Sequence, residues 1–245
     1  MNSSLNTLAK GFLLVSMAGA LVACGDSDND SSSNNNSAEA DRSFEVNVTN
    51  LTAGQPLSPT ALVVHTSGYH VFSVGSAASE ALEKLAEGGD NSDLITAADA
   101  DSHVLSTTSA AGALAPGGSE TFTLMVEGEM VSGALLSTVS MLVNTNDAIT
   151  ALNGVMLEDL GAGESISFNT LSYDTGTEAN TETAATIPGP AGGGEGFNAT
   201  RDDLSDRVNM HSGVVSADDG LTGSALSEMH RWDNPVTRIT ITRTH

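Results

Sequence analysis

The sequence predicts an all-β protein, an antiparallel β-sandwich with a small helical insertion. Short apolar stretches alternate with polar residues at the two-residue period of half-buried strands, and polar or glycine-containing turns separate them. The second half of the chain shows no strong helical pattern. The chain has 245 residues, of which 39% are hydrophobic. This is enough apolar side-chain surface to build the core of one sandwich.

The strands are predicted from short apolar runs taken in chain order. Alternating apolar residues predict strands at Phe44–Val48, Phe122–Val126 and Ile166–Phe168. Other runs predict strands at 62–65, 152–157 and 236–243. The longer apolar run Ala134–Val143, with Ser and Thr interleaved, is typical of a central strand. Many short strands joined by polar turns favour a sandwich.

The helical insertion is predicted after Ser76, which is placed as its N-cap. Apolar residues at 82, 85 and 86 lie on one helical face, and Gly88-Gly89 ends the helix. The acids Glu83 and Glu87 are predicted to form a solvated face. The stretch Leu94–Ala115 shows no clean period, so no element is predicted there.

The N-terminus predicts export and lipidation. Residues 1–23 form a signal peptide, with Lys10 before an apolar segment, 11–22, that is too short to span a bilayer. Leu21-Val22-Ala23-Cys24 resembles the bacterial lipobox, and Cys24, the only cysteine, is the predicted site of diacylation. An ordinary signal peptide cut near Ala23 is the alternative. Gly25 favours the outer membrane, facing the periplasm or the cell surface.

After Cys24, the composition of the chain predicts where the folded domain begins, and its net charge indicates which classes of partner it can bind. Residues 24–42 are a lipidated cysteine and an acidic Ser/Asn/Asp tether, and residues 43–245 are the sandwich domain. The formal net charge is −23, with 8 Lys plus Arg against 31 Asp plus Glu. Such a surface argues against nucleic acids and against anionic lipid headgroups, so membrane contact is expected only through the lipid. Cations suit this surface better.

Three carboxylates are the candidate metal ligands. Asp174 and Glu178 flank Gly176, which allows the loop to reverse, and Asp147 follows the predicted strand at 134–143 in the loop Asn144–Asp147. Calcium takes six to eight oxygen ligands, so these residues predict a Ca²⁺ site when the fold brings them together. The alternative is that each is a structural turn residue, a common role for Asp and Asn.

No catalytic constellation is evident, so a non-enzymatic protein is predicted. The six histidines lack the close spacing of zinc or copper ligands, and no serine lies in a G-x-S-x-G motif. Trp232 is interpreted as a core or rim aromatic residue, with a sugar-stacking platform as the alternative. The alternative function is a metal-dependent envelope hydrolase in which an ion held by Asp147, Asp174 and Glu178 activates water.

Several motifs together resemble the spondin N-terminal domain in its bacterial form. They are Asn146-Asp147, Tyr173–Glu178 and Trp232–Arg243, supported by Leu57-Ser58-Pro59, Ser79–Leu82 and Ala86–Gly89. The resemblance covers residues 42–245. It implies a β-sandwich whose loops at one end bind calcium, with Asp147, Asp174 and Glu178 as the ligands.

The resemblance also implies a role in binding. Animal members act in cell–matrix adhesion, so the expected partner is an unidentified protein or glycan of a matrix or cell surface. Two positions depart from the animal pattern. Ala148 stands where those members have an aromatic residue, and Glu178 stands where they have aspartate. A purely structural role, in which calcium only locks loops, is the third possibility.

Overall fold

The computed structural model describes residues 39–200 and 205–245. Within these residues it contains β1 (Arg42–Asn50), β2 (Ala61–His65), β3 (Val104–Ser109), β4 (Ser119–Val126), β5 (Leu135–Met141), β6 (Ala148–Met156), β7 (Ser165–Asp174), β8 (Asn209–Met210) and β9 (Thr237–Arg243). The helices are α1 (Glu80–Gly88) and α2 (Ser92–Asp99), with 3₁₀ turns η1 (Gly128–Met130) and η2 (Glu228–His230). The predicted signal peptide, Cys24 and most of the predicted tether lie outside the described residues.

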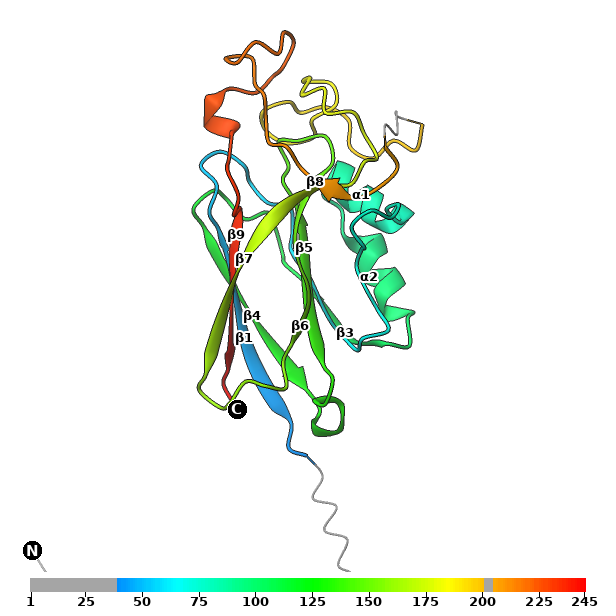
Figure 1. Ribbon diagram of the computed structural model, residues 1–245, viewed down its shortest axis with the longest axis vertical. Coiled ribbons are helices and arrows are strands. Elements are labelled where there is room, and N and C mark those ends of the chain that lie inside the picture. The colour runs from blue at the N-terminus through cyan, green and yellow to red at the C-terminus, as the bar shows by residue number, and fades with distance from the viewer. Residues whose placement is uncertain (1–38, 201–204) are drawn as a thin grey trace, which may run out of the picture. The chain divides into compact units, whose positions relative to one another are not determined.

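All strand pairs are antiparallel, and β7 joins two layers. The strand order is β3-β2-β5-β6-β7-β9-β1-β4. The first part of β7 pairs with β9, whereas its last four residues pair with β6. The strand therefore crosses from one layer to the other, which leaves a nearly closed sheet with β3 and β4 at its edges (Figure 1). This arrangement confirms the predicted all-β antiparallel fold.

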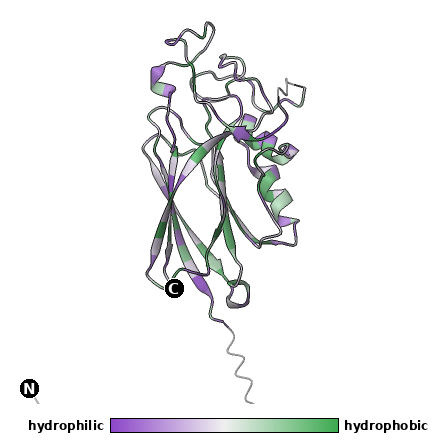
Figure 2. Cartoon of the chain, in the orientation of Figure 1, coloured by the Kyte–Doolittle hydropathy of each residue, from purple (hydrophilic) through white to green (hydrophobic). Residues whose placement is uncertain are grey.

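Two hydrophobic cores explain the sequence pattern. The main core lies between the layers and includes Phe44, Val46 and Val48 of β1, which alternate with polar residues that face outward. A second core includes Leu82 and Leu85 of α1, which pack on the outer side of the β5 and β6 layer. Both faces of β5 are therefore buried, and Ser137, Thr138 and Ser140 are buried among its apolar residues. Figure 2 shows hydrophobic residues along the strands and helices.

The helical insertion differs from the prediction in three ways. The N-cap is Ser79 rather than Ser76, because the Ser79 hydroxyl accepts the Leu82 N–H. A second helix, α2, and the strand β3 occupy parts of the stretch that showed no period. The side chain of Glu87 is buried, and one of its carboxylate oxygens accepts the Asn198 N–H at 3.0 Å, so it does not belong to a solvated face. Among the described residues, no helix is long and apolar enough to cross a membrane.

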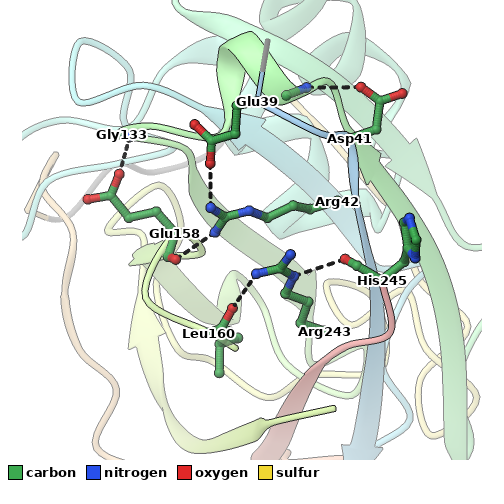
Figure 3. Close-up of polar contacts among 9 residues, drawn as sticks. Glu39, Asp41, Arg42, Gly133, Glu158, Leu160, Arg243 and His245 are labelled. Atoms are coloured by element: carbon green, nitrogen blue, oxygen red, sulfur yellow. Dashed lines mark hydrogen bonds and ion pairs between the residues drawn. The ribbon is translucent and has the colours of Figure 1, made fainter. Parts of the chain in front are cut away.

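Two arginines hold together the end of the sandwich at which β1 begins, here called the base (Figure 3). The Arg42 guanidinium pairs with Glu39 and donates to the carbonyl of Glu158 at 2.7 Å. Arg243 of β9 donates to the carbonyl of Leu160 at 3.1 Å. Because both carbonyls belong to the β6–β7 connection, the two arginines fix this loop to the first and last strands. The described chain enters the domain at this end (Figure 1).

A buried histidine links β2 to β5. The Nδ1 atom of His65 lies 2.8 Å from the carbonyl oxygen of Thr66, which can only accept, so Nδ1 carries the proton. Nε2 then accepts the Ser137 hydroxyl at 2.8 Å, and the Ser137 oxygen accepts the Gly154 N–H at 2.9 Å. Burial is the main cause that lowers the pKa of His65 below the usual 6.5. The ring is therefore held neutral.

His65 is expected to contribute a loss of domain stability as the pH falls below about 6.5, the ordinary histidine value. The unfolded state takes up a proton there, whereas the folded state does so only below the lowered pKa of His65. The loss levels off below that lower pKa. Thermal unfolding measured across this range should show a smaller pH dependence for His65→Gln. The exposed His245 provides the control, because His245→Gln should leave the pH dependence intact.

Candidate functional site

The candidate site lies at the end of the sandwich opposite the base, among loops called here the apical loops (residues 143–147, 175–200 and 211–236; Figure 1). Asp147 immediately precedes β6 and Asp174 ends β7. Ala148 pairs with Asp174 across these antiparallel strands. The strand register therefore brings the loop after β5 next to the loop after β7, as the predicted site requires.

The β5–β6 turn, Asn144–Asp147, connects the apical loops to one another. Thr145 closes the turn itself, because its hydroxyl donates to the Leu142 carbonyl and accepts the Ala148 N–H. The Asn144 amide donates to the Gly54 carbonyl at 3.0 Å, and its oxygen accepts the Ala191 N–H at 3.0 Å. Asn144 thus connects this short turn to two distant parts of the chain.

Asn146, the third residue of this turn, holds the loop that follows β7. Its side-chain nitrogen donates to a carboxylate oxygen of Glu178 at 3.0 Å. Its side-chain oxygen accepts the Glu182 N–H at 3.1 Å. One amide therefore positions two acidic residues by opposite ends of its side chain, which places Glu178 in the same cluster as Asp147.

Asp147 is fully buried, and its surroundings shift the pKa of its carboxyl group. Its Oδ2 accepts the N–H groups of Thr177 and Glu178 at 2.9 and 3.2 Å and the Thr175 hydroxyl at 3.0 Å. Its Oδ1 has no hydrogen-bond partner among the described residues. Burial, followed by the negative charge of Asp174, raises the pKa of Asp147 to about 6, against the opposing effect of the donated hydrogen bonds. A cation bound at Oδ1 would offset the free-energy cost of burying the ionised carboxylate.

Asp174 organises its own loop. Its Oδ1 accepts the Gly176 N–H at 2.9 Å and its Oδ2 accepts the Asn180 side-chain amide at 2.6 Å. Gly176 has a φ of +74°, and an added Cβ would lie 2.5 Å from the Arg207 carbonyl oxygen. Glycine is therefore required here both by backbone conformation and by space.

The three predicted ligands lie in one loop cluster without surrounding a common point. Among the described residues, no group of three or more His, Cys, Asp or Glu side chains is arranged to hold a metal ion. The donor chemistry nevertheless fits a hard cation, because the cluster supplies carboxylate oxygens and one of them, Asp147 Oδ1, is buried without a partner. Asp147, Asp174 and Glu178 are the residues that would hold such an ion, and its positive charge would offset their negative charges.

Glu182 is an important residue of the apical loops that the sequence did not reveal. It is buried, and its backbone has a positive φ of 55°. One carboxylate oxygen accepts the Val215 N–H at 2.7 Å, while the other accepts the Ser216 N–H at 2.9 Å and the Ser224 hydroxyl at 2.7 Å. This single side chain fixes the loop before η2. Its partners lie more than 30 residues away, so no local motif marks it.

His211 is the second residue whose role only the structure defines. Its Nδ1 accepts the Gly213 N–H at 2.9 Å, so its Nε2 carries the proton and donates to the Asn180 oxygen at 3.2 Å. Asn180 in turn donates to Asp174. Burial lowers the pKa of His211, although the charges of Asp174 and Glu182 act in the opposite direction. The histidine is thus a structural residue that orients the loop after β7.

The comparison with protein-family models matches Spondin_N over residues 50–188, which is more than half of the chain. The chain belongs to the Spondin_N family. No curated protein matches it. The matched residues of this Spondin_N domain include Asp147, Asp174 and Glu178 but end before β8 and the loops around η2.

Membership in the Spondin_N family has functional consequences. Spondin_N domains are non-enzymatic modules that are typically extracellular or secreted, and the family suggests a role in binding.

A surface hollow of the domain is lined by Glu228, Arg231, Trp232 and Asp233, none of which is a predicted metal ligand.

Proposed function

We propose that this Spondin_N domain is the ligand-binding module of a lipid-anchored protein of the bacterial cell envelope, acting in adhesion, and that calcium stabilises its apical loops. The expected partner is a protein or glycan of a matrix or cell surface. Family membership supports the binding role. The resemblance of residues 21–24 to a lipobox supports the lipid anchor, and Gly25 supports an outer-membrane location.

The calcium proposal rests on the buried Oδ1 atom of Asp147, which has no hydrogen-bond partner among the described residues. A carboxylate oxygen buried without a partner is costly, and bound cations commonly compensate such groups. The nearby charge of Asp174 adds repulsion to that cost. When bound, a calcium ion supplies positive charge that offsets both effects and cross-links the β5–β6 turn to the loop after β7.

The position of the apical loops supports the binding role. The described chain begins at Glu39 at the base, and the apical loops lie at the opposite end of the sandwich (Figure 1). Cys24 precedes that starting point by 15 residues. Attachment through the base leaves the apical loops available to a partner.

Calcium titration of residues 38–245 tests the proposal, because these residues form a compact unit that contains both cores. We expect heat of binding by calorimetry and an increase in unfolding temperature with calcium. At a calcium concentration a hundredfold above Kd, the stabilisation should be about 2.7 kcal/mol. Asp174→Asn should reduce both signals strongly.

A matched control separates this site from general attraction to an acidic surface. Asp159 is exposed in the β6–β7 connection at the base, so Asp159→Asn makes the same charge change far from the apical loops. This variant should retain the calcium response. Absence of both heat and thermal shift in the unsubstituted domain would refute the calcium proposal.

A further inference from the structure

A second candidate site lies at the apical end, outside residues 50–188. It is a hollow of about 350 Å³ lined by Glu228, Arg231, Trp232 and Asp233. These residues belong to η2 and the segment that leads into β9. The hollow uses none of the three candidate metal ligands, so it requires its own explanation.

The indole ring of Trp232 is held firmly at this hollow. Its N–H donates to the Ser172 hydroxyl at 3.1 Å, and its ring lies 5.3 Å from the ring of His211. The ring also packs against the main core and against a small apical core of Ile187, Val214 and Leu226. Trp232 is nevertheless only half-buried. It therefore fits both interpretations made from the sequence, as a rim aromatic residue and as a fixed apolar platform.

The rim of the hollow combines acceptors with donors. The carboxylates of Glu228 and Asp233 can only accept hydrogen bonds when ionised, whereas the Arg231 guanidinium can only donate. Neighbouring acids hold this rim in place. The Glu228 N–H donates to Asp218 at 2.8 Å, and Arg231 pairs with Asp219 at 2.5 Å.

These features restrict the chemistry of a ligand. The carboxylates of Glu228 and Asp233 would repel an anion, and the charge of Arg231 is offset by its pairing with Asp219. The half-buried indole and the mixture of acceptors and donors favour a neutral polar molecule over a simple cation. The molecule must donate to carboxylates, accept from a guanidinium and offer an apolar face to the indole ring. A pyranose ring has hydroxyl groups that donate and accept around its edge and C–H groups on its faces, and the hollow is large enough for it.

We propose that the hollow binds a neutral pyranose unit of an oligosaccharide or polysaccharide, with one sugar face on Trp232 and its hydroxyls on Glu228, Asp233 and Arg231. This inference rests on the proposed binding function, because it names the ligand class and the place of contact. It does not depend on calcium, since no candidate metal ligand lines the hollow.

Trp232 supplies its own test, because it is the only tryptophan of the chain and its fluorescence reports on the hollow. Four neutral probes, cello-, chito-, manno- and xylotetraose, are titrated into residues 38–245 while emission and heat are recorded. We expect at least one to give a saturable emission change that is nearly independent of salt. Glu228→Gln and Asp233→Asn should each weaken that binding about tenfold, the effect of losing a charge-assisted hydrogen bond.

Controls distinguish this proposal from the calcium proposal. Both variants are surface substitutions and should keep the calcium response, whereas Asp147→Asn should lose calcium and keep the sugar response. Asp159→Asn should keep both. A lysine-containing peptide is titrated as the cationic alternative. The sugar proposal is overturned when no tetrasaccharide changes the emission, or when only the peptide binds and its affinity falls with salt.

Discussion

Asp147→Asn is expected to have opposite effects on stability with and without calcium. In the calcium-free domain at pH 7 the substitution removes a buried charge whose pKa is raised to about 6, while Oδ1 of the asparagine still accepts the hydrogen bonds that Oδ2 now accepts. Removing this charge should stabilise the domain by about 3 kcal/mol. The amide nitrogen, buried without an acceptor at the position of Oδ1, should offset about 2 kcal/mol of that gain, which leaves the variant about 1 kcal/mol more stable than the original domain. With excess calcium the order should reverse, because only the original domain gains from binding.

Thermal unfolding of both proteins, with a chelator and with saturating calcium, measures this reversal. The control Asp159→Asn should change stability little in either condition, since exposed substitutions usually have small effects. If Asp147→Asn is equally destabilising with and without calcium, Asp147 acts only as an acceptor for the loop after β7. In that case the raised pKa of Asp147 reflects only its burial in the fold, and no bound ion offsets the free-energy cost of that burial.

Glu182→Gln is expected to release the loop before η2 and to destabilise the domain by about 3 kcal/mol. Both carboxylate oxygens of Glu182 accept hydrogen bonds from donors, at Val215 on one side and at Ser216 and Ser224 on the other. An amide nitrogen cannot accept, so one side must lose its partner whichever way the glutamine is turned. The shape of the side chain is nearly unchanged, which isolates the effect of hydrogen bonding.

Hydrogen exchange and thermal unfolding together check this expectation. Exchange should increase in the segment that contains Val215 and Ser216, whereas the strands of the main core should stay protected. Glu195 is exposed in the same apical loops, and Glu195→Gln provides the matched control with little expected effect. Unchanged exchange at 214–226 in Glu182→Gln would show that other contacts hold the loop.

The alternation of apolar residues was sufficient to predict strands such as β1 and β4, whereas β3 and β8 were not predicted. In β1 the apolar side chains of Phe44, Val46 and Val48 face the core because successive strand residues point to opposite sides, a local property that any sequence window contains. The helix boundaries were less predictable. Ser76 and Ser79 are both suitable caps, and only the contact of Ser79 with the Leu82 N–H decides between them. α2 is short, with a weak apolar pattern, and was missed.

For the candidate site, the sequence by itself determined which carboxylates are available near a glycine turn and at the end of a strand. The tertiary structure decided how deeply these carboxylates are buried and which groups form hydrogen bonds with them. The pairing of β6 with β7 buries Asp147 beside Asp174, and partners more than 30 residues away give Glu182 its role. Burial, pKa and hydrogen-bond satisfaction depend on groups that meet only after folding, whereas strand periodicity depends on neighbours in sequence.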